Sequence, residues 1–232
     1  MTRKLGFFAA LAAAVVVVAL PPPVSAQSPF GATTVQSPPN PVPAGTVVTY
    51  TTTVTNTSGE PWPPAITPPP DVFVSMYLTV AGSDSRATPN SYQSVVGSPG
   101  GCSNDATMPP SVNCPIGSLA PAQAATYTST VVAQVSMTNW VAVVGCASVD
   151  DCSSAADADV DTMVLQPCIV PNLLNRTLPS AKRRLAKHNC TLGKVKKKHA
   201  ARRKRGRVVR QKPAPGTKLP NSGKVTLFLG KS

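Results

Sequence analysis

The segment 206–229 constrains the fold of this chain most strongly, because it encodes two strands and a stiff turn between them. Two adjacent β-branched residues, Val208 and Val209, lie between cationic neighbours and suit a short strand. The run Pro213-Ala-Pro-Gly216 predicts a turn, since its prolines fix φ and its glycine can adopt a positive φ. Residues 224–229 then alternate as in a half-buried strand. We expect a β-hairpin with a proline-stiffened connection, and one apolar face formed by Val225, Leu227 and Leu229.

A short helix and an opening strand are predicted upstream of this hairpin. The opening strand begins near Cys168. Thr177 suits the N-cap of the helix, and Pro179 is tolerated in its first turn. Asn189 can supply a left-handed residue at the C-terminal end. Between these limits the apolar residues recur at helical spacing: Leu178, Ala181 and Leu185.

The order of these elements and their motifs resemble the PASTA domain family. The matching motifs are a Val170-Pro171 opening, T-x-x-x-A in the helix, G-x-V-x-x-Q-x-P-x-P-G-T-x-L from Gly206 to Leu219, and the final alternating strand. The resemblance covers residues 168–232 and implies a small α+β domain of order β-α-β-β-β. It also implies a noncatalytic module that recognises uncrosslinked peptidoglycan and, in some members, β-lactams.

The N-terminal segment has the features of a secretory signal peptide. Arg3 and Lys4 precede an apolar run over residues 5–20, and small residues stand at the −3 and −1 positions of a cleavage site after Ala26. An uncleaved anchor is the alternative. No cysteine that could carry a lipid follows the apolar run, and no later segment reaches the ~18 apolar residues of a membrane helix. We expect a signal peptide at 1–26 and a secreted, extracellular protein that can associate with the cell wall.

Cysteine usage agrees with export. All six cysteines follow the signal segment, and six allow about 15 pairings. Proximity in sequence favours three disulfides, because short loops close at the lowest entropic cost. No C-x-x-C motif is present, which argues against a zinc ribbon or a thioredoxin-like site. The favoured pairs are Cys102–Cys114, Cys146–Cys152 and Cys168–Cys190.

Charge divides the chain sharply. Residues 27–167 carry one arginine against nine acids, a net charge of −8, whereas residues 168–232 carry 19 Lys and Arg and no acid. Such asymmetry indicates separate domains and favours an anionic partner for the second one. We therefore expect domains at 27–167 and 168–232.

The first of these domains has the composition of a β-sandwich with proline-rich loops. Thr46–Asn56 is the strongest strand, with alternate residues on one face: Val48, Tyr50, Thr52 and Val54. Residues 27–45 are rich in Pro, Ser and Thr, and residues 59–70 hold six prolines and predict an extended loop. With no helical periodicity, the pattern predicts an all-β sandwich. The further strands expected are 72–80, 92–96, 114–119, 124–135, 139–146 and 160–165.

This domain also resembles a bacterial conserved-repeat Ig-like family. The motif P-x-P-x-G-x-x-V-x-Y-x-x-x-V-x-N runs from Pro41 to Asn56, and residues 116–121 and the strand at 124–135 add to it. The resemblance covers roughly residues 35–166. It implies an Ig-like sandwich in an extracellular or wall context, and it implies no activity.

Residues suited to catalysis are scarce. His188 and His199 lie among cations without a nearby carboxylate in sequence, and Glu60 is the single glutamate. We expect no enzyme, no catalytic residue and no cofactor. The cluster Asp157, Asp159 and Asp161 begins like a calcium loop, but Thr162 stands where glycine is required. The simpler interpretation is a solvent face of a strand, and we expect no metal.

The basic run at 194–210 is the candidate ligand-binding surface. Nuclear targeting is excluded for an exported protein, and specific nucleic-acid binding would need interleaved aromatics, of which residues 168–227 have none. Two interpretations remain: a solvated loop between the second and third strands of the PASTA-like unit, or a surface for anionic wall polymers or peptidoglycan carboxylates. The candidate residues are Lys194, Lys196, Lys197, Lys198, Arg202, Arg203, Lys204, Arg205, Arg207, Arg210 and Lys212.

The sequence therefore predicts a secreted, noncatalytic protein that binds peptidoglycan or another anionic envelope polymer through its C-terminal domain. The alternative is a structural or adhesive surface protein. In that case the Ig-like domain binds a protein partner, and the basic domain attracts anionic polymers without specificity. No membrane span is expected after cleavage of the signal peptide.

Overall fold

The computed structural model describes residues 29–62, 71–81, 92–97, 101–105, 111–148 and 151–231. The side chains of residues 71, 105, 146–148 and 151–154 are not among the described ones. The expected signal peptide at 1–26 lies outside the described residues, as does most of the proline-rich loop. Among the described residues, no helix is both long and apolar enough to cross a membrane.

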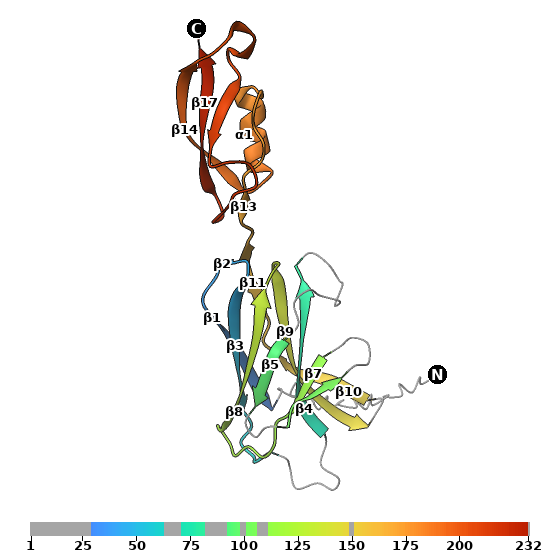
Figure 1. The fold of residues 1–232 in the computed structure, drawn as a ribbon. Coiled ribbons are helices and arrows are strands. Elements are labelled where there is room, and N and C mark those ends of the chain that lie inside the picture. The colour runs from blue at the N-terminus through green and yellow to red at the C-terminus, as the bar shows by residue number, and fades with distance from the viewer. Residues whose placement is uncertain are drawn as a thin grey trace, which may run out of the picture.

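Two antiparallel sheets form the N-terminal part of the protein (Figure 1). The strand order of the first sheet is β1 (Phe30–Ser37), β3 (Thr46–Asn56), β8 (Ala124–Ala133) and β5 (Tyr92–Gly97). The second follows the order β10 (Asp151–Asp157), β9 (Met137–Ser148), β4 (Asp71–Val80), β7 (Ser111–Pro115) and β6 (Ser103–Asp105). A short strand, β11 (Val160–Thr162), also pairs with β9.

The two sheets pack face to face, and their inward side chains form the core. Alternate residues of β3 are buried, as the sequence predicts, while the residues between them are partly or fully exposed. Val54 of β3 and Tyr127 of β8 share one cluster with Met76 of β4 and Val143 of β9, so this cluster draws on both sheets. Alternating strands that bury one face against a second sheet make a β-sandwich. The predicted all-β architecture is confirmed for the described residues of this part of the chain.

Several strands of the sandwich differ from the sequence prediction. β1 and β10 were not expected, because their residues are mostly small or polar and carry a weak apolar pattern. Both are edge strands whose ladder comes from pairing with β3 and β9. The strand expected at 114–119 is instead β7, which ends at Pro115 because Gly117, at φ +70°, breaks the extended chain.

The strand expected at 160–165 is divided in two. β11 pairs with β9 of the second sheet, whereas β12 (Val164–Leu165) pairs in parallel with β2 (Val42–Pro43). Met163, between them, is 59% exposed. The chain therefore changes its hydrogen-bonding partner at Met163, from β9 to β2. The C-terminal unit begins two residues after β12.

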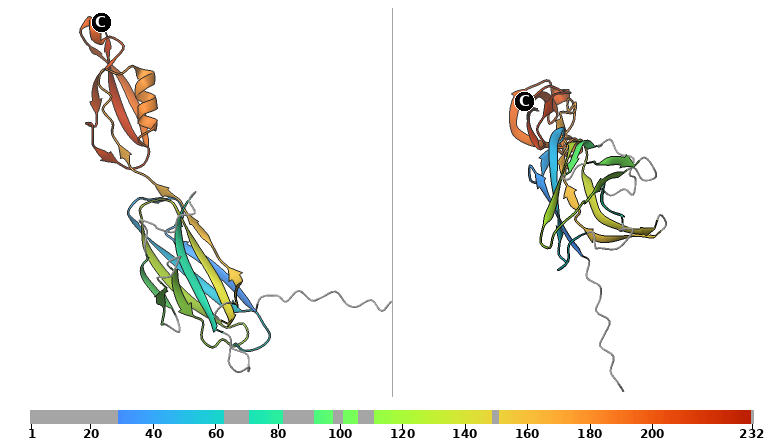
Figure 2. Two further views of the ribbon diagram at one scale, coloured as in Figure 1. Left: turned by 90° about the vertical axis from the view of Figure 1, so that its right-hand side faces the viewer. Right: turned by 90° about the horizontal axis from the view of Figure 1, so that it is seen from below.

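The C-terminal unit contains one α-helix and a three-stranded sheet (Figures 1 and 2). The sheet has the order β14 (Cys190–His199), β17 (Gly223–Lys231), β15 (Val208–Lys212). β14 runs parallel to β17, and β15 runs antiparallel to it. The short strands β13 (Cys168–Ile169) and β16 (Lys218–Leu219) form a separate pair. Apart from β16, this is the predicted order of one strand, one helix and three strands.

Helix α1 (Leu178–Ala186) packs its apolar side against this sheet. Ala181 and Leu185 are buried in one cluster with Val225 and Leu227 of β17. Thr177 occupies the N-cap position, but its side chain makes no capping hydrogen bond. Beyond the helix Asn189 takes a φ of +55°, the predicted left-handed conformation.

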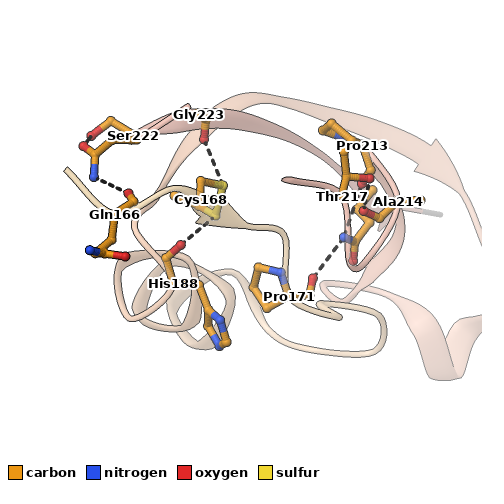
Figure 3. The surroundings of a disulfide bond; sticks show 12 residues. Gln166, Cys168, Pro171, His188, Pro213, Ala214, Thr217, Ser222 and Gly223 are labelled. Carbon is orange, nitrogen blue, oxygen red and sulfur yellow. Dashed lines mark hydrogen bonds between the residues drawn. A yellow bond between two sulfur atoms is a disulfide. The ribbon is translucent and has the colours of Figure 1, made fainter. Parts of the chain in front are cut away.

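Two of the predicted disulfides are confirmed. Cys168 and Cys190 join the starts of β13 and β14, with Cα atoms 4.8 Å apart (Figure 3). Cys102–Cys114 ties the segment before β6 to β7. The backbone register sets Cys152 opposite Cys146, but these side chains lie outside the described ones, so their bond stays a prediction.

A very short segment joins the two parts. Only Gln166 and Pro167 separate β12 from β13. The Asn221 side chain donates a hydrogen bond to the Gln166 carbonyl oxygen, at 2.8 Å, so the segment is also tied to the turn before β17 (Figure 3). Such a connection restricts the motion of the C-terminal unit near its point of entry.

Candidate anion-binding surface

The sheet of the C-terminal unit has one covered face and one open face. α1 covers the face that carries Val225 and Leu227 (Figure 2). Because side chains alternate along a strand, Lys224, Thr226 and Phe228 project from the other face of β17. We call this second face the open face. Lys224 is exposed there, and Thr226 and Phe228 are half-buried.

A row of three side chains crosses the open face. Lys196 of β14 and Arg210 of β15 are both in register with Phe228 of β17, one on each side. The Arg210 guanidinium carbon lies over the Phe228 ring, 5.6 Å from its centroid. This distance is within the range of a cation–π interaction. The aromatic ring therefore helps to fix the position of the guanidinium group.

Further cations follow the row along the sheet. Lys212 is in register with Thr226, one pleat from Phe228 in one direction, and Lys198 is in register with Gly230, one pleat away in the other. All four flanking cations are exposed. The open face thus carries a band of cations on the two outer strands, β14 and β15, and β17 lies between them.

A crossover segment bounds the open face at one end. Residues 200–207 leave β14 beside Lys231 and join β15 after pairing with Gly230. A Cβ atom on Gly230 would lie 2.3 Å from the Lys204 carbonyl oxygen. Since that Cβ would point to the open face, the segment must pass over β17 on this side, and only glycine leaves room for it. The crossover holds the 3₁₀ turn Arg202–Lys204, all of whose residues are exposed.

The structure corrects one expectation for the basic run. Residues 194–199 belong to β14 and are not part of a loop, because this strand continues in parallel with β17 as far as Lys231. Their positions are consequently set by the ladder. Only residues 200–207 form the connection between the second and third strands.

The predicted ligand residues do not all reach the open face. Lys196, Lys198, Arg210 and Lys212 are brought together there, with the crossover cations Arg202, Arg203, Lys204 and Arg205 at its end. Lys197 is in register with Leu229, which packs on the core beneath α1. Arg207 donates a hydrogen bond to the Asn175 carbonyl oxygen, at 3.0 Å. Lys194 lies in a bulge between the two stretches of the β14–β17 ladder.

No carboxylate side chain of the same unit can neutralise these cations, because residues 168–232 contain no Asp or Glu. His188 and His199 therefore gain no acidic neighbour from this unit either. Like charges held together in this way repel one another, and an anion from outside the unit relieves that repulsion. The arrangement can therefore bind anions.

The acidic cluster of the sandwich takes part in local hydrogen bonds. The Asp159 carboxylate accepts one from the Val141 backbone N–H, at 3.0 Å, and Asp161 accepts one from the Thr138 hydroxyl, at 2.7 Å. Burial raises the pKa of Asp159, and the charges of Asp157 and Asp161 raise it further, against the lowering effect of the Val141 bond. Within the described residues no group of three or more His, Cys, Asp or Glu side chains could hold a metal ion.

Residues 169–231 match the PASTA domain family. This segment is a PASTA domain. No curated protein shows significant similarity to the chain. PASTA domains are binding modules and not catalytic ones, so the match assigns a binding role to the unit that carries the open face.

The glutamine of the PASTA motif has a structural role that the sequence pattern alone did not reveal. Gln211 is 7% exposed, and its Oε1 accepts a hydrogen bond from the Leu173 backbone N–H at 2.8 Å. Its Nε2 donates to the Pro171 carbonyl oxygen at 3.0 Å. One side chain thus joins the opening segment of the PASTA domain to β15, on the strand that carries Arg210.

Phe228 is the residue of the site that sequence reasoning missed. Residues 168–227, which contain all the candidate cations, have no Phe, Trp or Tyr, and Phe228 is the residue that follows them. A signal was present, because the alternation that buries Val225 and Leu227 places Phe228 on the opposite face. Its neighbours Lys196 and Arg210 could not be identified without the pairing of the three strands.

Proposed function

We propose that this protein is a noncatalytic, exported cell-envelope protein whose PASTA domain binds peptidoglycan or another anionic wall polymer. The observation that carries the proposal is the concentration of exposed cations on one PASTA domain that has no carboxylate of its own. Polymers with repeated carboxylates or phosphates provide the complementary charge. The signal-peptide pattern at 1–26 and the two disulfides support an oxidising, extracytoplasmic location.

The proposal includes the division of the mature chain. An Ig-like sandwich at 27–167 presents the PASTA domain at 168–232, and the short Gln166–Pro167 segment keeps the two parts close along the chain. The separate apolar cores of the two parts support this division. A net charge of −8 on the first domain makes it unsuited to bind an anionic polymer itself, so binding should depend on the second.

A structural or adhesive function is the second candidate, and one feature of the sandwich favours it. Tyr77 of β4 and Trp140 of β9 stack side by side, with ring centroids 6.0 Å apart. Trp140 is 37% exposed, and its indole N–H donates to the Thr79 hydroxyl at 2.8 Å. Partly exposed aromatic residues of this kind are enriched at protein interfaces.

Sedimentation with purified cell walls separates the two candidates. The mature chain should be retained at low salt, and a chain that ends at residue 167 should stay in the supernatant. Retention should weaken as salt rises, because the Debye length is only ~8 Å at physiological ionic strength. Replacement of Lys196, Lys197, Lys198, Arg202, Arg203, Lys204 and Arg205 by serine should abolish it. Equal retention of the truncated chain would favour the adhesive sandwich.

A further inference from the structure

The cations of the PASTA domain are not equivalent, because the fold places some of them beside Phe228 on the open face and others on different surfaces. We infer that a glycan strand bearing carboxylates binds along the open face, over Thr226 and Phe228, with Arg210 and Lys196 as its anion contacts. The inference rests on the proposed function and adds to it a defined face, a set of contact residues and a ligand class.

The spacing of the row suits an extended ligand. Neighbouring strands lie roughly 4.8 Å apart, so the Lys196 and Arg210 backbones, on either side of β17, are about 10 Å apart. Lys198 and Lys212 extend the band by about 7 Å along each outer strand, in opposite directions. An extended ligand that lies along the band can contact several of these cations at once. A single small anion is too short to do so.

Arg210 is the best-prepared of these contacts. Its guanidinium is held over the Phe228 ring, so part of its conformational freedom is already lost before a ligand arrives. A planar guanidinium can also form two parallel hydrogen bonds with one carboxylate, which a lysine ammonium cannot. Phe228 thus acts as a positioning residue for Arg210, on the face that the helix leaves open.

The same contact argues against a nucleic acid as the ligand. Single-stranded nucleic acids gain affinity by stacking bases on free aromatic faces. Arg210 lies over one face of the Phe228 ring, and residues 168–232 contain no second Phe, Trp or Tyr on which a further base could stack. The crossover at residues 200–207 closes the end of the face at Gly230 and directs further cations to that end.

Two double variants of the full mature chain test the assignment with equal loss of charge. K196Q/R210Q removes one lysine and one arginine from the open face. K182Q/R184Q removes the same pair from exposed positions on α1, which covers the opposite face of the sheet. The probe is purified peptidoglycan freed of attached polymers, with depletion from the supernatant measured at several concentrations.

We expect the open-face pair to weaken binding about tenfold and the control pair no more than about threefold, because exposed ion pairs each contribute a few-fold. Equal weakening by both pairs would overturn the assigned face and leave the proposed function intact. Failure of the unmodified chain to bind would remove both. A third outcome would identify a nucleic acid, and not a glycan, as the ligand of the open face. In that case a single-stranded oligonucleotide would displace the chain from peptidoglycan, and K196Q/R210Q would lose oligonucleotide binding while the control pair would not.

A conservative variant keeps the test independent of folding defects. Arg210→Lys retains the charge and loses the planar fork, so it should weaken binding several-fold while Lys196→Arg does not. Phe228→Leu should weaken binding about two- to fivefold, the range of an exposed cation–π contact, and should have no further effect in the Arg210→Gln background. Additive effects of Phe228→Leu and Arg210→Gln would show that the ring does not act through Arg210.

Discussion

Loss of the Cys168–Cys190 disulfide should destabilise the PASTA domain far more than the sandwich. The bond closes a loop with a sequence separation of 22 residues. On the chain-entropy model, release of a loop of this length costs about 3 kcal/mol at 25 °C. Small domains have total stabilities of roughly 5–15 kcal/mol, so this is a large share for a unit of this size. The melting temperature should fall by roughly 10–25 °C, since each 1 kcal/mol shifts a domain of this size by about 4–8 °C.

The two parts of the chain have separate spectroscopic reporters. Both tryptophans and all four tyrosines precede residue 168, so tryptophan fluorescence follows the sandwich alone. The α-helix of the described residues belongs to the PASTA domain, so the helical signal in far-UV circular dichroism follows that domain. C168A/C190A should lower the helical transition and leave the fluorescence transition in place. The matched control, C102A/C114A, opens a loop with a separation of 12 residues and should do the reverse.

One control removes the ambiguity of the alanine variants. Both cysteines of the PASTA domain are buried, so alanine also removes sulfur contacts with the core. Mild reduction of the unmodified chain opens the loop while both sulfur atoms remain. A shift of less than about 3 °C in the helical transition under reduction would refute the loop-closure reasoning, because the expected entropy term is several times larger.

Two further predictions concern single side chains. Gln211→Leu leaves the Leu173 N–H and the Pro171 carbonyl oxygen without their buried partner, so the free energy of unfolding measured from the helical transition should fall by roughly 2–4 kcal/mol. The control Lys218→Met, at an exposed position, should change it little. A Q211L variant as stable as the unmodified chain would show that these bonds are dispensable. Burial and the acidic neighbours of Asp159 raise the pKa of its carboxyl above 3.8 in the folded protein. At pH values above this raised pKa the ionised carboxylate destabilises the sandwich, and the destabilisation disappears as the pH falls through the raised pKa. Asp159→Asn should therefore raise the fluorescence melting temperature at neutral pH, and the gain should shrink under acidic conditions; a gain that grows with acidification would contradict this sign.

The sequence predicted best those strands whose burial pattern is local. The bounds expected for Thr46–Asn56 agree with β3, and the burial of Val225 and Leu227 follows their alternation. β1 and β10 escaped prediction because their own residues carry little apolar signal, and their order comes from a neighbouring strand. Propensity describes a segment in isolation, while an edge strand depends on its partner.

The candidate site shows the same limit at the level of side chains. Each cation could be named from the sequence, but their distribution between two faces depends on the parallel register of β14 with β17 and on a bulge within it. A register shift of one residue would exchange Lys196 for Lys197 on the open face. The disulfide between Cys168 and Cys190 was accessible from the sequence because a short intervening helix returns the chain to its start.

The parallel pairing of β14 and β17 has a practical consequence for experiments on this protein. Both strands finish at the same end of the sheet, so Lys231 lies beside His199 and the crossover that starts at Ala200. Any chain continued beyond Lys231 starts at this basic end. An acidic epitope fused there would bring a tethered competitor to the cations at a high effective concentration. Immobilisation or labelling through the opposite end of the chain keeps the open face available to a polymer.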